Sequence, residues 1–599
     1  MTPTASRFLA AVLLTGGAAH AALAQVPTGP GTPDDAIRIN QVGYLPDAPK
    51  VAVVCALAPR AVRQFEVVTE AGKRVLGPKP AVESGKFGPC AQTYRLDFST
   101  LREAGQYRIR AGTMISPIVR IGPGVWNGLA EMPLRYLRQQ RSGFNPVYNT
   151  SVHTKDGIIV DHPTRAGEYL PASGGWADAS DYLQYVTTSA TAAFQLLQAY
   201  RDNPRAFGDE YQSDGLPGAN GTPDVLDEAR HGLAWLLRMF PDDSLMLNQL
   251  GDDRDHMFFD LPPNDSADYG WGKGGARPLY PCTGIAQGLL RYQNRATGYA
   301  STAGKFAAAF ALGAQMLKAS DTALADTLHR KAVAAFALGE KYPGPCQTAP
   351  GRGAYFYEED DWEDDMELGA AALYALTADV RYQGKAMAYA AKAKVKPWMG
   401  ADTANHYQWY PWHNLGHYEA ARRGTLNERL TLTGYYRTGL KAVAAKAENG
   451  FRVGIPFIWC SNDLMTSLAV QALLYRRITG DNDYRALEQS AIDWLFGTNP
   501  WGVSMVIGVP ADGNFARDPH AVISVKLKYQ LDGGLLDGPV YASIFKNLAG
   551  IALTKPDQYA RWNTGHIVYH DDWGDYSTNE PIMDGAANVL YLLSWLGRR

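Results

Sequence analysis

Residues 174–182 read Gly-Gly-Trp-Ala-Asp-Ala-Ser-Asp-Tyr, which places two carboxylates, Asp178 and Asp181, three positions apart. A Gly-Gly turn precedes them, and an apolar pattern with helical spacing begins at Tyr182. A second acidic cluster, which ends at Glu580, lies near the end of the chain. Hydrolysis of a glycosidic bond uses a pair of carboxyl groups, one protonated and one ionised. The sequence therefore raises the hypothesis that these two clusters form one site.

Each carboxylate also has an ordinary structural explanation. Asp181 would cap the helix expected from Tyr182, because aspartate is a favoured N-cap residue. Glu580 precedes Pro581, and proline is favoured at the first position of a helix. A helix N-terminus stabilises the ionised carboxylate, which opposes a general-acid role, whereas nearby Asp178 and Asp181 would raise the pKa of Glu580. The general-acid hypothesis therefore requires the two clusters to converge.

Composition narrows the class of protein. The chain has 599 residues, of which 46% are hydrophobic and 20% charged, so it is long enough and apolar enough for a packed core. Its formal net charge of −3 does not indicate a nucleic-acid partner. We expect most of the 14 Trp and 33 Tyr in the core or at domain interfaces, but a surplus could line a cleft, since flat rings of this kind stack on sugar faces.

The first residues have the pattern of a cleavable secretory signal peptide, which we assign to residues 1–24. Arg7 supplies the basic end, residues 8–15 are apolar, and Ala22-Leu23-Ala24 is a small-x-small cleavage site. The apolar run is too short to span a bilayer, and no later stretch has the pattern of a membrane span. We therefore expect a secreted or periplasmic protein, with residues 25–36 as a linker rich in Pro, Gly and Thr.

The pattern of the remaining chain changes once. Residues 37–122 contain short alternating runs separated by turn residues, which predicts a small all-β sandwich. Residues 124–599 show helical apolar spacing without interleaved strands, which predicts one large all-α domain, consistent with a double ring of helix hairpins. The helical patterns fall at 182–201, 224–240, 283–297, 302–318, 321–340, 364–377, 380–393, 427–448, 462–479, 483–496, 541–553 and 582–597.

The five cysteines are too few for a disulfide scaffold. Cys55 and Cys90 fall in the same small domain and could form a bridge in an oxidising compartment. Cys282, Cys346 and Cys460 are scattered, and we expect buried thiols there. No CxxC spacing indicates zinc.

Four ordered motifs resemble those of glycoside hydrolase family 9, the cellulase group with an (α/α)6 barrel. Residues 175–182 resemble the signature GGWxDAGDY, with Ser180 in place of Gly, and residues 222–230 resemble its DLLDEARW helix. Residues 497–500 resemble its GxNP motif, and the stretch 571–580 keeps the spacing D-x4-Y-x3-E. Residues 37–121 resemble the immunoglobulin-like domain that often precedes the barrel. The resemblance covers nearly the whole mature chain and implies an Ig-like β-sandwich followed by an (α/α)6 barrel.

The resemblance also implies roles for the site residues. Asp181 would be the general base, Asp178 would help to hold the attacking water, and Glu580 would be the general acid of an inverting reaction. His520 matches the family's active-site histidine and would bind a sugar hydroxyl, although a single histidine is more often structural. Asp571, which we group with the catalytic residues, and Tyr576 would support the Glu580 loop.

Loop aromatics are the candidates for sugar binding, and we expect about half of the loop tryptophans to be packing residues instead. The candidates are Trp176, Tyr182, Trp271, Trp412, Trp459 and Tyr576.

An acidic run such as 358–365 is usually a solvated face, but a binding site for a hard cation is the more specific interpretation. By the resemblance, a structural calcium would lie at Asp360, Asp361, Asp364 and Asp365, although Asp360 replaces a Ser of that motif. We expect no cofactor to be required for catalysis.

Two departures from the family leave the glycan open. Val522 stands where an Arg is common, and Gly585-Ala586 replaces a Tyr-Asn pair; both family motifs touch sugar in the minus-side subsites. We expect a monomeric endo-β-1,4-glucanase acting on cellulose, mixed-linkage glucan or xyloglucan. The alternatives are an exo-acting enzyme on glucosaminide or cello-oligosaccharide ends, a non-catalytic glycan-binding protein, and a polysaccharide lyase on a similar helical toroid.

Overall fold

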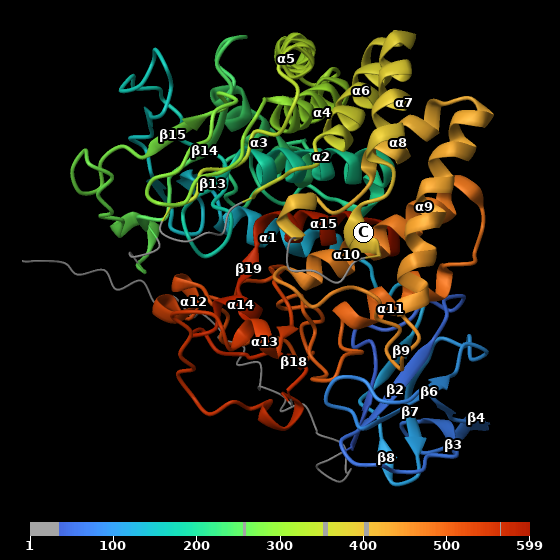
Figure 1. The fold of residues 1–599 in the computed structure, drawn as a ribbon. Helices are drawn as coiled ribbons and strands as arrows, with labels where there is room; N and C mark the ends of the chain where they lie inside the picture. Colours follow the sequence, from blue (N-terminus) through green and yellow to red (C-terminus); the bar gives the residue numbers. More distant parts are fainter. Residues whose placement is uncertain (1–34, 256–258, 352–356, 401–405, 564, 599) are drawn as a thin grey trace, which may run out of the picture.

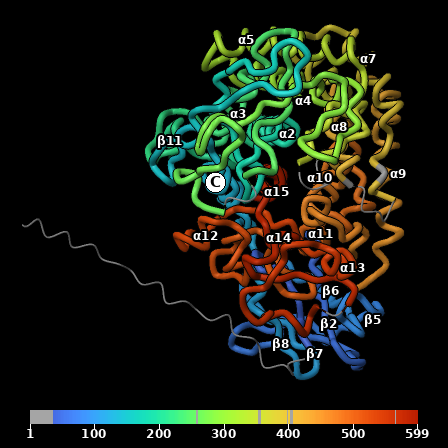
Figure 2. Tube along the Cα trace, turned by 60° about the vertical axis from the view of Figure 1, so that its left-hand side comes forward, coloured from blue at the N-terminus to red at the C-terminus, as the bar shows by residue number. Residues whose placement is uncertain are grey.

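The computed structural model describes residues 35–598 except 256–258, 352–356, 401–405 and 564. The predicted signal peptide and nearly all of the predicted linker lie outside these residues. A small β-domain sits at the foot of a larger helical domain, and the C-terminal segments α12 (Val522–Leu527), α13 (Ala542–Phe545) and α14 (Tyr576–Asn579) lie below the barrel at the same end (Figures 1 and 2). Within the described chain, no helix combines the length and apolar character needed to cross a bilayer.

The β-domain is a sandwich of two antiparallel sheets, as the alternating runs predict. One sheet has the order β1-β2-β6-β5, and the other has the order β4-β3-β7-β8, with β9 also paired to β7. Alternate residues of each strand face inward, so that Val54 and Leu96 of one sheet join Phe65, Val67 and Ile109 of the other in one apolar core. The strands are β1 (Asp35–Arg38), β2 (Val51–Ala56), β3 (Gln64–Thr69), β4 (Arg74–Pro80), β5 (Val82–Glu83), β6 (Gln92–Asp97), β7 (Gly105–Ala111), β8 (Met114–Ile115) and β9 (Val119–Ile121).

The helical domain is a double ring, and the chain alternates between its outer and inner helices. Within the described residues, six inner helices contact one another in the closed order α2-α4-α6-α8-α10-α15. Each also contacts the outer helix that follows it in the chain, and α15 closes the ring against α1. The inner helices are α2 (Val186–Asp202), α4 (Ala300–Leu317), α6 (Glu363–Thr377), α8 (Leu415–Arg423), α10 (Ser461–Thr479) and α15 (Met583–Leu596). The outer helices are α1 (Met132–Gln139), α3 (Asp224–Met239), α5 (Thr322–Lys341), α7 (Val380–Ala393), α9 (Leu426–Lys446) and α11 (Arg485–Leu495). This arrangement is the (α/α)6 barrel that the sequence predicts.

Helical spacing was misleading in two segments. Residues 283–297 form no helix, because Gly284 adopts the left-handed φ of +68° and Gly288 is a second poor helix former. Residues 541–553 contain only the single turn of α13. The spacing also missed α1 and α8, whose short apolar faces fall below the length at which periodicity is clear.

The prediction of an all-α domain also missed several short sheets at the barrel ends. One has the order β12 (Ile158–Ile159), β15 (Pro278–Pro281), β14 (Leu247–Leu250) and β13 (Gln184–Tyr185). Another pairs β16 (Leu535–Leu536) with β19 (Pro581–Ile582). The remaining pairs are β10 (Gly143–Asn145) with β11 (Thr150–Val152), and β17 (Val540–Tyr541) with β18 (Ile567–Val568). Strands β13 and β19 lead directly into inner helices α2 and α15, so they fix the two segments that carry the candidate acids.

Two disulfides are present. Cys55 and Cys90 form the bridge that the sequence allowed in the β-domain. Cys282 and Cys346 form a second bridge, with Cα atoms 5.5 Å apart, so the expectation of buried thiols at these two positions is wrong. Their separation in the sequence hid the pairing. Cys460 is the free, buried cysteine that the sequence predicts.

The two domains share one apolar core. Val42, Val53 and the Cys55–Cys90 bridge belong to the same buried cluster as the helical barrel. The side-chain amide of Asn40 donates to Asp493 of α11 at 2.9 Å, in a fully buried setting. The β-domain is therefore packed against the barrel rather than tethered to it.

Candidate active site

The loop that carries Asp178 and Asp181 ends in a strand rather than in a helix. The strand β13 follows it, and α2 begins only at Val186, so Asp181 is not the N-cap that the sequence suggested. The carboxylate of Asp181 instead accepts the backbone N–H of Leu183 at 3.1 Å and remains half-buried. The N-cap of α2 is instead Tyr185.

Glu580 also lies outside a helix N-terminus. Pro581 is in strand β19 and α15 begins at Met583, so the expected helix start at Pro581 is wrong. The backbone N–H of Met583 donates to the carbonyl of Asp178 at 2.9 Å. The dipole of α15 thus acts mainly on the Asp178 loop, because its influence is confined to the first turn.

The two acidic segments meet. The backbone N–H of Ser180 donates to Oε1 of Glu580 at 2.9 Å across 400 positions of sequence, and the Ser180 hydroxyl donates to the same oxygen. Asp178, Ser180, Asp181 and Glu580 line one cavity of about 590 Å³. In the sequence, Ser180 is only a departure from a motif, whereas in the structure it holds the candidate acid by two hydrogen bonds.

The surroundings of Glu580 favour its protonated form. Burial raises the pKa of Glu580, and the charge of Asp181 raises it further, against the lowering effect of His520 and of the two hydrogen bonds from Ser180. With Oε1 held by Ser180, Oε2 is the oxygen left to carry and donate a proton. This is the state that a general acid needs.

Asp178 is the more deeply buried of the two aspartates, with 7% of its surface exposed. Its carboxyl oxygens accept hydrogen bonds from the hydroxyl of Thr188 on α2 and, at 3.0 Å, from that of Tyr357. Burial raises the pKa of Asp178, and the neighbouring Asp584 and Asp181 raise it further. Asp178 is thus rigidly positioned, while Asp181 is more open to the cavity.

The ring of His520 is oriented by a backbone carbonyl. Its Nδ1 lies within hydrogen-bond distance of the Trp573 carbonyl, which can only accept, so Nδ1 carries the proton and donates. Nε2 is then the ring nitrogen that can contact a substrate in the cavity, which His520 lines.

Asp571 lies under the loop that carries His520. Its carboxylate accepts the backbone N–H groups of Arg517 and Asp518 at 2.8–3.0 Å. It does not line the cavity, and it supports this loop directly rather than the Glu580 loop as we expected. Sequence spacing could not distinguish support of the His520 loop from support of the Glu580 loop, because the two loops are in contact: the backbone N–H of His520 donates to the carbonyl of Asn579.

Aromatic side chains form one wall of the cavity. Trp459 and Tyr576 both line it, and their rings stack with centroids 5.4 Å apart. Phe259, Tyr357 and Tyr407 also line it, although the sequence analysis did not select them. The aromatic content of the loop at 355–365 was the available signal for Tyr357.

Other predicted sugar contacts lie elsewhere. Trp176 is fully buried, with its indole N–H donating to Glu228 at 2.8 Å and its ring packed against Gly232. Trp412 is also fully buried, so the interpretation of both tryptophans as sugar platforms is wrong. Trp271 is 40% exposed but does not line the cavity. Tyr182 is nearly buried, and its hydroxyl donates to the carbonyl of Asp260. The ring of Trp176 packs inward because the glycine turn before it lies against α3.

Asp537 is a cavity residue that the sequence analysis missed. It is 1% exposed, and its carboxylate accepts the indole N–H of Trp459 at 2.9 Å and the thiol of Cys460 at 3.3 Å. Its backbone N–H donates to the carbonyl of Glu580 at 2.8 Å. Burial raises the pKa of Asp537, and the charge of Glu580 raises it further. Among the described residues that line the cavity, His520 is the only basic side chain.

The acidic run at 358–365 does not fit a calcium site. The ammonium group of Lys396 lies 2.9 Å from Asp361 and also contacts Asp364. Asp365 pairs with Lys305 at 2.6 Å, and Asp360 pairs with Arg295 at 3.1 Å. Across the described parts of the chain, no three acidic, His or Cys side chains converge in a way that could hold a metal ion. Cationic side chains occupy the positions where the sequence suggested calcium.

Comparisons with known proteins agree with this geometry. A family model described as "Glycosyl hydrolase family 9" matches residues 126–593, and one described as "Cellulase N-terminal ig-like domain" matches residues 32–116. Endoglucanase C of Cellulomonas fimi is 27% identical over 94% of this chain, which spans only 52% of that protein's length. The cellodextrinase of Butyrivibrio fibrisolvens is 26% identical over 81% of this chain and 86% of its own. The crystal structure of a metagenome-derived glycoside hydrolase family 9 endoglucanase superposes with a TM-score of 0.73 at 26% identity, covering 94% of this chain and 99% of that one.

Proposed function

This chain belongs to glycosyl hydrolase family 9, an enzyme family acting on glycosidic bonds, and we propose that it is an inverting hydrolase of β-1,4-linked glucans. The observation that supports this most strongly is the convergence of Asp178, Asp181 and Glu580 in one aromatic-walled cavity. The names of its relatives, an endoglucanase and a cellodextrinase, point to β-1,4-glucan as the substrate class. The signal-like residues 1–24 support export from the cell, and we propose that the enzyme acts as a monomer.

The proposed reaction is a single displacement. Asp181 takes a proton from a water molecule, whose oxygen attacks the anomeric carbon on the face opposite the leaving sugar. The bond from the anomeric carbon to the bridging oxygen breaks, and Glu580 donates its proton to that oxygen. Asp178, held by Thr188 and Tyr357, fixes the water beside Asp181. One water is consumed, and the proton gained by Asp181 balances the one lost by Glu580.

The aromatic wall provides the binding surface for the sugar. Trp459 and Tyr576 present stacked rings, a surface that suits the apolar face of a glucose unit. Nε2 of His520 is placed to contact a sugar hydroxyl close to Glu580. The proximity of the two groups is seen in the pKa of Glu580, which His520 lowers. Binding energy from this wall orients the linkage between the acid and the base.

The experiment that tests this proposal is a product profile combined with the configuration of the first product. Carboxymethylcellulose, mixed-linkage glucan, xyloglucan and chitosan oligosaccharides are compared, and proton NMR follows the first minutes of each reaction. We expect glucan cleavage with the α-anomer appearing first. A β-anomer first would contradict inversion, an unsaturated product absorbing in the ultraviolet would indicate a lyase, and binding without new reducing ends would indicate a non-catalytic protein.

One observation favours a second candidate, an exo-acting glucosaminidase. The cavity is lined by four carboxyl groups, Asp178, Asp181, Asp537 and Glu580, and His520 is the only basic side chain among its described lining residues. An ammonium group at carbon 2 of the sugar would favour the ionised form of these carboxyl groups and pair with them. Chitosan oligosaccharides cleaved from one end, with higher kcat/KM than cello-oligosaccharides, would select this candidate. Asp537→Asn would then reduce kcat/KM for the amino sugar more than for the neutral one.

A further inference from the structure

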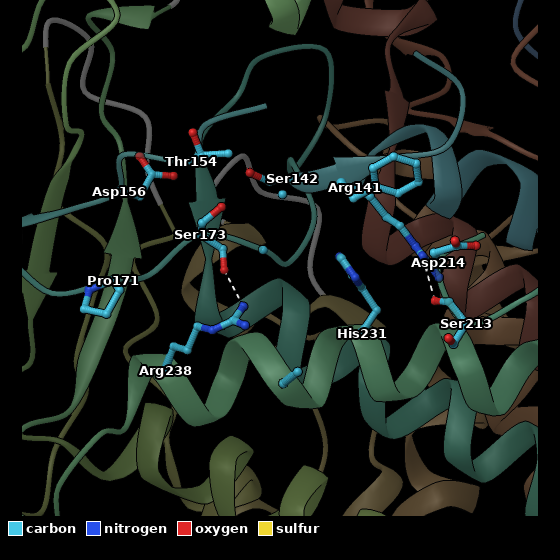
Figure 3. A pocket seen from close by; sticks show the side chains of 14 residues that line it. Arg141, Ser142, Thr154, Asp156, Pro171, Ser173, Ser213, Asp214, His231 and Arg238 are labelled. Atoms are coloured by element: carbon cyan, nitrogen blue, oxygen red, sulfur yellow. Dashed lines mark hydrogen bonds between the residues drawn. The ribbon is translucent and has the colours of Figure 1, made fainter. Parts of the chain in front are cut away.

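A second cavity, of about 390 Å³, lies at the beginning of the loop that carries the catalytic aspartates (Figure 3). Ser173 and Gly174 line it, only four positions before Asp178, yet none of its lining residues lines the catalytic cavity. Figure 3 shows Thr154, Ser142 and Ser173 above helix α3, which carries His231 and Arg238. The mechanism proposed above uses none of these side chains.

A buried hydroxyl in this cavity has no partner. Ser142 is 2% exposed, and within the described part of the chain its Oγ makes no hydrogen bond. Buried polar groups are nearly always hydrogen-bonded, and leaving one unsatisfied costs about 1–3 kcal/mol. A ligand hydroxyl in the cavity would satisfy Ser142 Oγ.

The charges of the cavity are largely compensated by the protein itself. Arg141 forms a buried double hydrogen bond with Glu228 at 2.7 and 3.0 Å, and Asp156 forms one with Arg277 at 2.8 and 2.9 Å. The remaining charged lining residues, Arg238 and Asp214, have opposite signs. The cavity therefore has no net charge to attract an anion or a cation.

His231 adds an acceptor to this neutral cavity. Its Nε2 lies 2.9 Å from the Gly175 carbonyl, which can only accept, so Nε2 carries the proton. Burial and the charge of Arg141 lower the pKa of His231 to about 4, so the ring is neutral at pH 7. Nδ1 is then an acceptor on a residue that lines the same cavity as Ser142 and Ser173.

We propose that this cavity is a second binding site, for a neutral sugar of one or two units. A hydroxyl group both donates and accepts, which matches the mixture of Ser142, Thr154, Ser173 and His231, and Phe144 supplies an aromatic surface. The volume falls within the usual range of small-molecule sites. That the sugar is a product of the catalytic cavity rests on the function proposed above, whereas the existence of the site does not.

Three variants of the full chain test the site by calorimetry with cellobiose as the probe, each combined with Glu580→Gln to suppress turnover. Ser142→Ala removes the unpartnered hydroxyl, and we expect the affinity of this site to fall about three- to tenfold with no loss of thermal stability. Ala234→Phe, at an exposed α3 position that lines the cavity, fills the space and abolishes binding there. Ser189→Ala is the matched control, because it removes another buried hydroxyl without a partner, on α2 and outside both cavities.

We expect the Glu580→Gln chain to bind cellobiose at two classes of site, and Ala234→Phe to leave one. A single class of site that Ala234→Phe does not change would overturn the proposal, as would an equal effect of Ser142→Ala and Ser189→Ala. Preferential binding of inorganic phosphate that Ala234→Phe removes would show an anion site instead and would also overturn it. Hydrolysis by the wild-type chain is measured separately, so failure of this site and failure of the proposed function are distinguishable.

Discussion

The catalytic cavity and the acidic cluster near α6 both concentrate buried carboxyl groups, but they compensate them differently. In the cluster, Lys305 and Lys396 are buried among the acids and pair with them at short distances. In the cavity, no Lys or Arg is found among the described lining residues. We call the first group the lysine-paired cluster; its acids are Glu359, Asp361, Asp364 and Asp365.

The difference teaches how a carboxyl group becomes reactive. An ammonium partner favours the charged form of a buried carboxyl group, so Lys305 and Lys396 act against the burial that raises the pKa of Asp365 and brings that of Asp364 to about 7. Without such a partner, burial raises the pKa of Asp178, Asp537 and Glu580, so that protons can reside on them near neutral pH. The sequence shows two acidic clusters, and the positions of Lys305 and Lys396 distinguish the cluster near α6 from the one that lines the cavity.

The largest expected effect separates the two regions by activity. Glu580→Gln removes the proton donor but keeps the shape of the side chain, and we expect kcat to fall roughly 10²–10⁴-fold. The melting temperature should stay close to that of the wild type, because Ser180 can still donate to the amide oxygen. Initial rates on the preferred glucan and a thermal melt measure both. Turnover within threefold of the wild type would remove Glu580 as the acid.

The next effect distinguishes the lysine-paired cluster from the cavity by its influence on stability. Lys396→Met leaves the buried Asp364 and the half-buried Asp361 without this ammonium partner, and we expect a loss of about 3–5 kcal/mol in the free energy of unfolding. Urea denaturation measures the loss, while kcat per folded molecule should be unchanged. Adding Asp364→Asn should restore part of the stability; if it does not, the loss comes from packing rather than from unpaired charge.

A smaller effect appears in the pH dependence of stability. Asp537 has a raised pKa in the folded state, so its contribution to stability is fully present below the unfolded pKa and is lost as pH rises through the folded pKa. Asp537→Asn removes this loss. The melting temperature of the variant relative to that of the wild type should therefore be higher at pH 8 than at pH 5. Equal differences at the two pH values would show that Asp537 does not carry an uncompensated charge. Glu488→Gln, at a carboxylate paired with Arg476, is the control and should show no such gain at pH 8.

The smallest expected effect concerns divalent cations. Because Lys396 and Lys305 already pair with the acids of the lysine-paired cluster, neither EDTA nor added calcium should shift the melting temperature by way of these acids. Differential scanning fluorimetry with and without each reagent measures this. A calcium-dependent rise that Asp364→Asn abolishes would show that the cluster binds the ion.

The sequence predicted the fold class and the convergence of the two acidic segments because these depend on periodicity and on local motifs. The alternating strands and the long helices are visible in the apolar spacing, and the carboxylates stand in short ordered motifs. Other features depend on contacts between distant segments, which spacing does not encode. The Cys282–Cys346 bridge, the pairing of Lys396 with Asp364 and the place of Asp537 beside Trp459 are of this kind.

Local propensity also misplaced both helix starts next to the acids. Asp181 and Pro581 each have the composition of a helix N-terminus, but the chain first forms the short strands β13 and β19. Those strands pair with β14 and β16, so tertiary pairing overrides local preference. The aromatic residues show the same limit, because Trp176 and Trp459 look equivalent in the sequence and only Trp459 reaches the cavity.

The core shared by the two domains determines what can be cut or exchanged in this chain. Val53 and the Cys55–Cys90 bridge pack against the barrel, and Asn40 donates a hydrogen bond to the buried Asp493. An isolated barrel would therefore expose an apolar surface patch and leave the Asp493 carboxyl group without this hydrogen bond. Deleting the β-domain or exchanging it for another domain should therefore give insoluble protein. Grafting of further modules should begin instead at the exposed loop tips.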